Sequence, residues 1–350
     1  MKTSFISSLG VADSVRTHLM RMQTEISKLE KEVVTGRVAD TGLALGARTG
    51  QSVSLERDID RLGGIITSNA LVGARLSATQ SGLKSLSDLA QQFLSTMTAA
   101  VAGAVDPEIS KADAKTLVTT MTGVLNASLN GENIFAGVNT DVRPINDFFA
   151  AGSPAQAAMA SAFQTHFGFA HTDPAAGAVD AAQITDFLNN VIEPMFMGAD
   201  WTGAMNWSEA TDETISARIT LTETTQASVS ANTDGVRQLA MAGAVVAFFL
   251  DGELGEIAQD AVIRFSASKV GQATVSIARV QAQAGIIEQR VAAASDRLQM
   301  QIDIFRGKVS DLVEIDPYEA STRVSNLLSQ IETAYTLTSR LRQLNLVNYL

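Results

Sequence analysis

Cysteine is missing from all 350 residues of the chain, proline occurs only 6 times, and aromatic residues make up 5%. The missing cysteines exclude disulfides, thiolate zinc sites and a cysteine nucleophile, although a chain without cysteine fits either side of a membrane. At 46%, the hydrophobic share is ample for a core. Few prolines and few aromatics together favour long helices that pack through small aliphatic side chains.

Basic charge is also scarce. The net charge is −11, and Lys and Arg nowhere form a continuous basic run, so the attraction that drives binding to phosphate backbones is missing. We therefore expect no nucleic-acid partner and no membrane partner. The longest apolar stretch, Leu239 to Leu250, is shorter than the ~20 residues that span a bilayer and predicts a buried helix.

The N-terminal residues, Met1 to Gly10, lack the apolar centre of a secretory signal before Asp13. We expect no cleavable signal and a different export route. Further on, prolines are absent from 1–106 and from 195–316, which leaves two tracts free of the strongest helix breaker.

The first proline-free tract opens with apolar residues at spacings of three and four, the seam of a coiled coil. These residues are Ala12, Val15, Leu19, Met22, Ile26, Leu29 and Val33. Glycines at 36, 42, 46 and 50 then predict a joint, because each costs about 1 kcal/mol in a helix interior. Periodicity resumes from Leu55 to Val101 and predicts a second, long helix.

An Asp-Pro pair can mark a helix start, since Asp caps a helix and Pro suits its first turn. Asp106-Pro107 predicts a third helix through Leu129, ended by Asn130-Gly131. Asp316-Pro317, with Glu319 completing a capping box, starts the last helix. Its seam consists of Val324, Leu327, Ile331, Ala334, Thr338 and Leu341.

The middle of the chain differs in composition. Residues 140–240 hold four of the six prolines and both tryptophans, and alternation from Ile215 to Leu221 predicts a strand that returns at 226–231. The expected fold is mainly α: long coiled-coil-type terminal helices packed as a bundle, with a small α+β insertion. We divide it into terminal segments 1–45 and 313–350, a helical rod of 46–139 and 241–312, and an insertion of 140–240.

Residues that carry chemistry are not grouped in this sequence. His166 and His171 have no third ligand nearby, and acidic pairs such as Asp58 and Asp60 fit solvated helix faces. We predict no catalytic, cofactor-binding or metal-binding residue, and therefore no enzyme.

Three stretches resemble the bacterial flagellin family: the first helix with Thr35-Gly36-Arg37-Val38, the segment Asn130 to Gly137 with Thr140 and Pro144, and the end from Leu341 to Leu350. Together the similar regions cover about two thirds of the chain. Within the family, two short stretches are more similar to the hook-filament junction members than to filament flagellins. They are Ile134-Phe135-Ala136-Gly137 and Asn348-Tyr349-Leu350.

This resemblance implies a structural subunit that is exported unfolded by the flagellar type III route and lies outside the cell. Implied partners are the hook-side junction protein, flagellin, identical subunits in a ring, and an export chaperone. Filament flagellin and a non-flagellar coiled-coil adaptor remain alternatives. The candidate assembly residues are the larger seam positions Leu19, Met22, Ile26, Leu29, Val33, Val324, Leu327, Ile331 and Leu341.

Overall fold

The computed structural model describes residues 8–343. Within this range the long helices are α1 (Ser8–Thr35), α3 (Thr49–Val101), α4 (Pro107–Leu125), α9 (Glu256–Val313) and α10 (Pro317–Gln343). Shorter helices are α2 (Thr41–Leu45), α5 (Pro154–Phe167), α6 (Ala181–Phe187), α7 (Glu193–Met197) and α8 (Asp234–Phe249), with a π-helical segment at Leu188–Ile192. The expected mainly α fold is confirmed.

Among the described residues, three 3-10 helices lie at Gly46–Arg48, Pro174–Ala178 and Ala199–Trp201, and the strands form two antiparallel hairpins. β1 (Ser128–Leu129) pairs with β2 (Glu132–Asn133), and β3 (Ser216–Arg218) pairs with β4 (Thr224–Gln226). The chain divides into a terminal unit, residues 1–63 and 299–350, and a central unit, residues 64–298. The long helices α3 and α9 contribute residues to both units.

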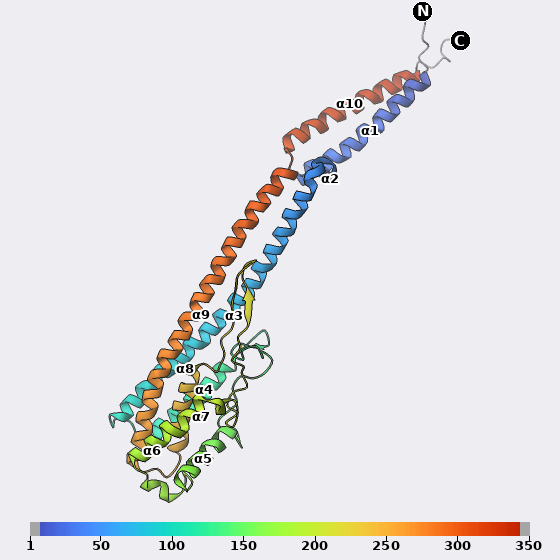
Figure 1. The fold of residues 1–350 in the computed structure, drawn as a ribbon. Coiled ribbons are helices and arrows are strands. Elements are labelled where there is room, and N and C mark those ends of the chain that lie inside the picture. The colour runs from blue at the N-terminus through green and yellow to red at the C-terminus, as the bar shows by residue number, and fades with distance from the viewer. Residues whose placement is uncertain (1–7, 344–350) are drawn as a thin grey trace, which may run out of the picture. The chain divides into compact units, whose positions relative to one another are not determined.

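In the terminal unit, α1 and α10 pack against each other in opposite directions (Figure 1). α1 ends where Gly36 adopts a left-handed conformation, with φ of 67°, and its N–H donates to the carbonyl of Glu32. A small core follows, in which Leu45, Val309 and Val313 are buried and Val38, Leu55, Ile59 and Leu312 pack around them.

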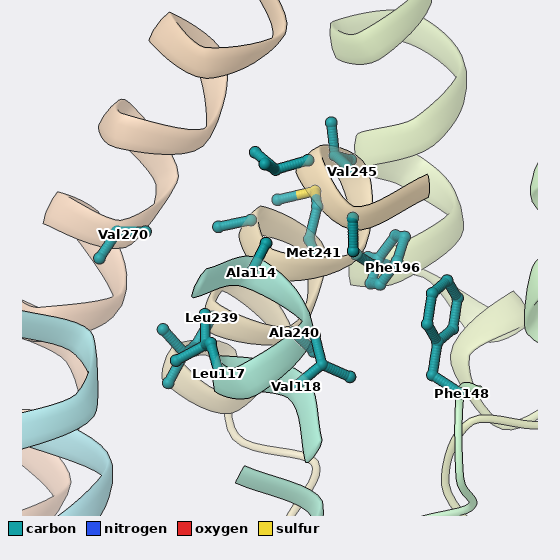
Figure 2. Packing of buried hydrophobic residues seen from close by; sticks show 14 of the residues in the cluster. Ala114, Leu117, Val118, Phe148, Phe196, Leu239, Ala240, Met241, Val245 and Val270 are labelled. Atoms are coloured by element: carbon teal, nitrogen blue, oxygen red, sulfur yellow. The ribbon is translucent and has the colours of Figure 1, made fainter. Parts of the chain in front are cut away.

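In the central unit, the predicted buried helix is confirmed as α8. α4 packs along it, and Figure 2 shows Leu117 and Val118 of α4 lying against Leu239 and Ala240 of α8. A Cβ atom at Gly243 would come within 2.8 Å of the Val118 Cγ2 atom. Glycine therefore permits the close approach of the two helices at this point.

Both hairpins correct details of the sequence interpretation. α4 ends at Leu125, capped by Asn126, rather than at Asn130-Gly131. Asn130 and Gly131 instead form the turn between β1 and β2, with φ values of 53° and 87°, which is the conformation that favours an Asn-Gly hairpin turn. The returning strand was expected at 226–231 but lies at 224–226, because the chain reverses tightly between Ile219 and Glu223.

Candidate assembly surface

The predicted seam residues belong to α1 and α10, which pack against each other, and the burial of these residues is uneven. Ile26, Leu29 and Ile331 are buried, with 9%, 5% and 9% of their surface exposed. Leu19, Met22, Val324 and Leu327 are half-buried, and Val33 is exposed. Leu341 lies in α10, but its side chain falls outside the described part of the structure, as do Asn348, Tyr349 and Leu350. With Ala320 of α10, which is 4% exposed, four apolar residues are enclosed in the described parts of two helices of 28 and 27 residues.

The same helices also carry large apolar side chains that remain exposed in the described chain. Met20 and Val34 of α1 are exposed, as are Leu328, Tyr335 and Leu337 of α10. One side-chain hydrogen bond joins the helices, from the Gln23 Nε2 atom to the Tyr335 Oη atom at 3.0 Å. The pair of helices therefore leaves large apolar side chains exposed on its surface.

At the joint predicted from the glycines, main-chain hydrogen bonds connect the segment after α1 to the segment before α10. The Val38 N–H donates to the Val313 carbonyl at 2.9 Å, and the Ile315 N–H donates to the Gly36 carbonyl at 3.1 Å. Arg37 and Glu314 form an antiparallel bridge between these bonds. Asp40 then caps α2 by accepting from the Leu43 N–H. The segments that follow α1 and precede α10 are therefore fixed to each other by their main chains.

The stretch Ile134 to Gly137 is part of the central core and not of a surface. Ile134, Phe135 and Ala136 are all buried, and the Phe135 ring lies so close to Gly82 that a Cβ there would come within 2.7 Å of the ring. Gly137 has φ of 72°, and a Cβ would lie 2.3 Å from the Thr211 Oγ1 atom. These four residues therefore position the chain that follows β2 against the rest of the central unit.

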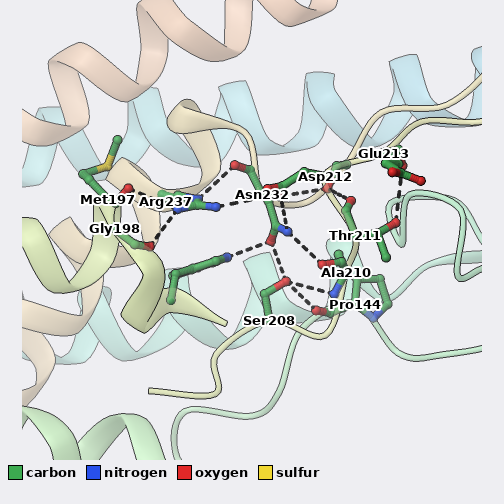
Figure 3. Close-up of polar contacts among 12 residues, drawn as sticks. Pro144, Met197, Gly198, Ser208, Ala210, Thr211, Asp212, Glu213, Asn232 and Arg237 are labelled. Carbon is green, nitrogen blue, oxygen red and sulfur yellow. Dashed lines mark hydrogen bonds and ion pairs between the residues drawn. The ribbon is translucent and has the colours of Figure 1, made fainter. Parts of the chain in front are cut away.

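A buried polar network around Asn232 was not predicted (Figure 3). The Asn232 Oδ1 atom accepts from the Trp201 Nε1 atom at 2.8 Å and from the Ser208 Oγ atom at 2.6 Å. Its Nδ2 atom donates to the Ala210 carbonyl and to the Asp212 carboxylate. All four hydrogen bonds of the amide are made, so the network fixes loops rather than offering a reactive group.

Ionisable groups in the described part of the chain do not form a reactive constellation. No three His, Asp or Glu side chains there could hold a metal ion together. Burial lowers the pKa of His171, partly opposed by the charge of Asp251, and the ring stacks 4.3 Å from the Phe248 ring. The Glu108 carboxylate, followed by that of Asp251, raises the pKa of Lys111. Among the described helices, none is long and apolar enough to cross a membrane.

Comparison with known families agrees with this architecture. Residues 6–140 match the bacterial flagellin N-terminal helical region, and residues 267–350 match the bacterial flagellin C-terminal helical region. The two matches take in more than half of the chain, one at each end, and the chain belongs to the bacterial flagellin family. It is a structural component of the flagellum, from a family whose members assemble with flagellar proteins and with copies of themselves.

The fold is similar to a solved structure from Vibrio parahaemolyticus, provisionally described as a flagellar hook-associated protein. The TM-score is 0.52 at 12% sequence identity, and the similarity covers 76% of this chain and 97% of that one. No curated protein matches the sequence. At this identity, the similarity concerns the fold.

Proposed function

We propose that the protein is the adaptor of the hook-filament junction, a non-catalytic subunit that links the hook-side junction protein to flagellin. Its subunits would form a ring of identical copies through the terminal helices. The observation that carries the assembly role is the incomplete burial of the seam between α1 and α10, where Leu327 is half-buried and Val33 is exposed. A surface of this kind is completed by another chain.

The junction position rests on a narrower set of residues. Ile134 to Gly137 and Asn348 to Leu350 resemble the junction members of the family, and the fold similarity to a protein described as hook-associated supports the same position. Filament flagellin shares the terminal helices and is the second candidate. The third, a coiled-coil adaptor outside the flagellum, would share only the periodicity.

Deletion of the gene separates these candidates. Loss of a junction adaptor leaves hooks assembled while flagellin escapes into the medium, because the filament has nothing to grow from. Loss of the filament flagellin removes the filament protein itself, and loss of a non-flagellar adaptor leaves filaments normal. Electron microscopy of the deletion strain, with immunoblots of the medium for flagellin, measures all three outcomes.

The assembly seam is tested by a charge at Leu327. Leu327→Asp places a carboxylate in an apolar contact, and a charge that becomes buried and unpaired costs several kcal/mol, about 3 or more. Asn326→Asp, at the exposed neighbouring position, adds the same charge outside the seam and is the matched control. We expect loss of motility and of junction rings with Leu327→Asp, and neither effect with Asn326→Asp.

Two outcomes of this experiment would contradict the proposal. Motility retained with Leu327→Asp would mean that the seam is not an interface. A purified Leu327→Asp monomer whose central unit melts far below that of the wild type would place the seam in the folded core instead. Tryptophan fluorescence makes this distinction, because Trp201 and Trp207 both lie in the central unit.

Export is expected to use the flagellar type III apparatus, with a chaperone that holds the chain before secretion. The protein should remain inside cells that lack the flagellar export gate but keep the general secretory pathway. Its appearance in the medium of such a strain, measured by immunoblot against a cytoplasmic marker, would contradict the flagellar route.

A further inference from the structure

The β3–β4 hairpin reaches onto two long helices of the central unit. We call residues 215–227 the finger, and residues 64–80 of α3 with residues 281–298 of α9 the stem. At the tip of the finger, Ile219 is fully buried in a small cluster with Leu76 of α3 and Val291 and Ala294 of α9. Figure 1 shows the finger, in yellow, beside α3. This cluster is separate from the main core of the central unit.

Polar contacts join the same three segments. The Asn69 Nδ2 atom, on α3, donates to the Ile219 carbonyl at 3.0 Å and to the Ser295 Oγ atom of α9 at 3.1 Å. Glu223, at the tip of the finger, pairs with Arg290 and with Arg297 of α9. The Asn69 amide of the stem and the Glu223 carboxylate of the finger thus tie the finger to α3 and to α9.

Without Ile219, the apolar contact of the stem in this cluster consists of Leu76, Val291 and Ala294, with Val72 and Ile287 partly buried beside them. Polar side chains adjoin this contact. Asn69 is 1% exposed and its Oδ1 atom has no partner, and the Gln80 side chain is directed at the Gln281 carbonyl of α9. Buried polar groups stabilise a helix contact poorly unless all of them are paired. The finger alone is no more stable, because an isolated two-stranded hairpin is marginal in water.

We propose that the finger is a conformational clasp. Docked, it holds the two stem helices together, and undocked, it lets them separate locally while the main core of the central unit stays folded. Two of its contacts are ion pairs between side chains that are 26–60% exposed, so salt weakens the docked state. The stiffness of the stem is therefore set by a short segment distant from it in sequence.

The sharpest test removes the finger. Its base is already closed, since the Ala227 N–H donates to the Ile215 carbonyl at 2.7 Å, so residues 216–226 can be replaced by Gly-Gly in the full-length chain. We expect amide hydrogen exchange in the stem to rise at least about tenfold, with exchange in α8 unchanged. Stem exchange equal to that of the wild type would overturn the clasp, and so would loss of protection in α8 together with the stem.

A point variant and a distance measurement give the second test. Ile219→Asp undocks the tip, and Leu221→Asp, at a residue of the same finger that is 39% exposed, is its control. The chain has no cysteine, so spin labels at exposed Ser68 and Ala292 report one distance across the stem. We expect Ile219→Asp, and 1 M salt compared with about 0.05 M salt in the wild type, to broaden that distance, while Leu221→Asp leaves it narrow. A narrow distance in Ile219→Asp, with the finger amides exchanging freely, would show that the stem closes by itself.

Discussion

The terminal and central units differ in how completely they bury their apolar side chains. In the central unit large side chains such as Trp201, Phe163 and Phe249 are wholly enclosed. In the terminal unit the best-buried apolar residues of α1 and α10, Leu29 and Ala320, keep 5% and 4% of their surface exposed, and large apolar side chains face outward. The central unit therefore encloses large side chains completely, whereas α1 and α10 enclose few apolar side chains between them.

Tryptophan and tyrosine report on the two units separately. Both tryptophans lie at positions 201 and 207, in the central unit, and the two tyrosines that the structure describes, Tyr318 and Tyr335, lie in the terminal unit. Unfolding followed by each fluorophore therefore measures one unit without labels.

The largest effect is expected from Phe163→Ala. Its ring lies 5.5 Å from Phe187 and 5.6 Å from Phe249, between centroids, and is fully buried. The cavity should cost about 3–5 kcal/mol. Thermal unfolding of the purified protein, followed by tryptophan fluorescence, should show a lower midpoint. A change below about 1 kcal/mol would mean that this aromatic cluster is loosely packed.

Asn232→Ala should follow, at about 2 kcal/mol or more, because each buried group left without a partner costs roughly 1–3 kcal/mol. The variant leaves the Trp201 Nε1 atom and the Ala210 carbonyl without their partner. Asn139→Ala, at an exposed side chain of the same unit, is the control. If the two variants had equal midpoints of denaturation, measured by tryptophan fluorescence, the network would not stabilise the central unit.

Leu29→Ala should destabilise the terminal unit and leave the central unit nearly unchanged. Leu29 lies in the seam of α1, so its truncation should increase hydrogen exchange in α1 and α10, while the tryptophan transition moves by less than about 0.5 kcal/mol, as for independent sites. A tryptophan transition that falls as far as in Phe163→Ala would show that the units unfold as one and would break the comparison.

The smallest effect concerns pH. Burial lowers the pKa of His171 in the folded protein, so folding favours the neutral ring. The stability that this provides is complete above the unfolded value, about 6.5, and is lost as the pH falls through the lowered folded value. His171→Gln should therefore flatten the decrease in stability between pH 7 and pH 5, measured by urea unfolding.

Periodicity was sufficient for the long helices. Spacings of three and four identified α1 and α10, and the pairs Asp106-Pro107 and Asp316-Pro317 marked the starts of α4 and α10 where the structure has them. These signals are local, because caps and helix faces depend on neighbours within one turn.

Contacts between residues far apart in the sequence could not be predicted from it. Asn232 bonds to Trp201 and Ser208, a pairing that no spacing encodes. The Asn130-Gly131 turn was interpreted as a helix end, although the same two residues are a strong hairpin signal when short strands flank them. The half-burial of Leu327 could not be predicted either, since a heptad pattern does not say how much of the seam its partner covers.

The main-chain bonds that join Val38 to Val313 and Ile315 to Gly36 can form only late in the synthesis of the chain. The Gln23 and Tyr335 side chains that bond to each other are separated by 312 positions, and the main-chain bonds of Val38 and Ile315 bridge nearly as many. A ribosome releases the chain from its N-terminus, so α1 is the first helix to emerge and among the last to find its partner. Until α10 has been synthesised, the apolar face of α1 lacks the helix against which it packs in the folded chain. The first helix to be synthesised is therefore among the last to complete its packing.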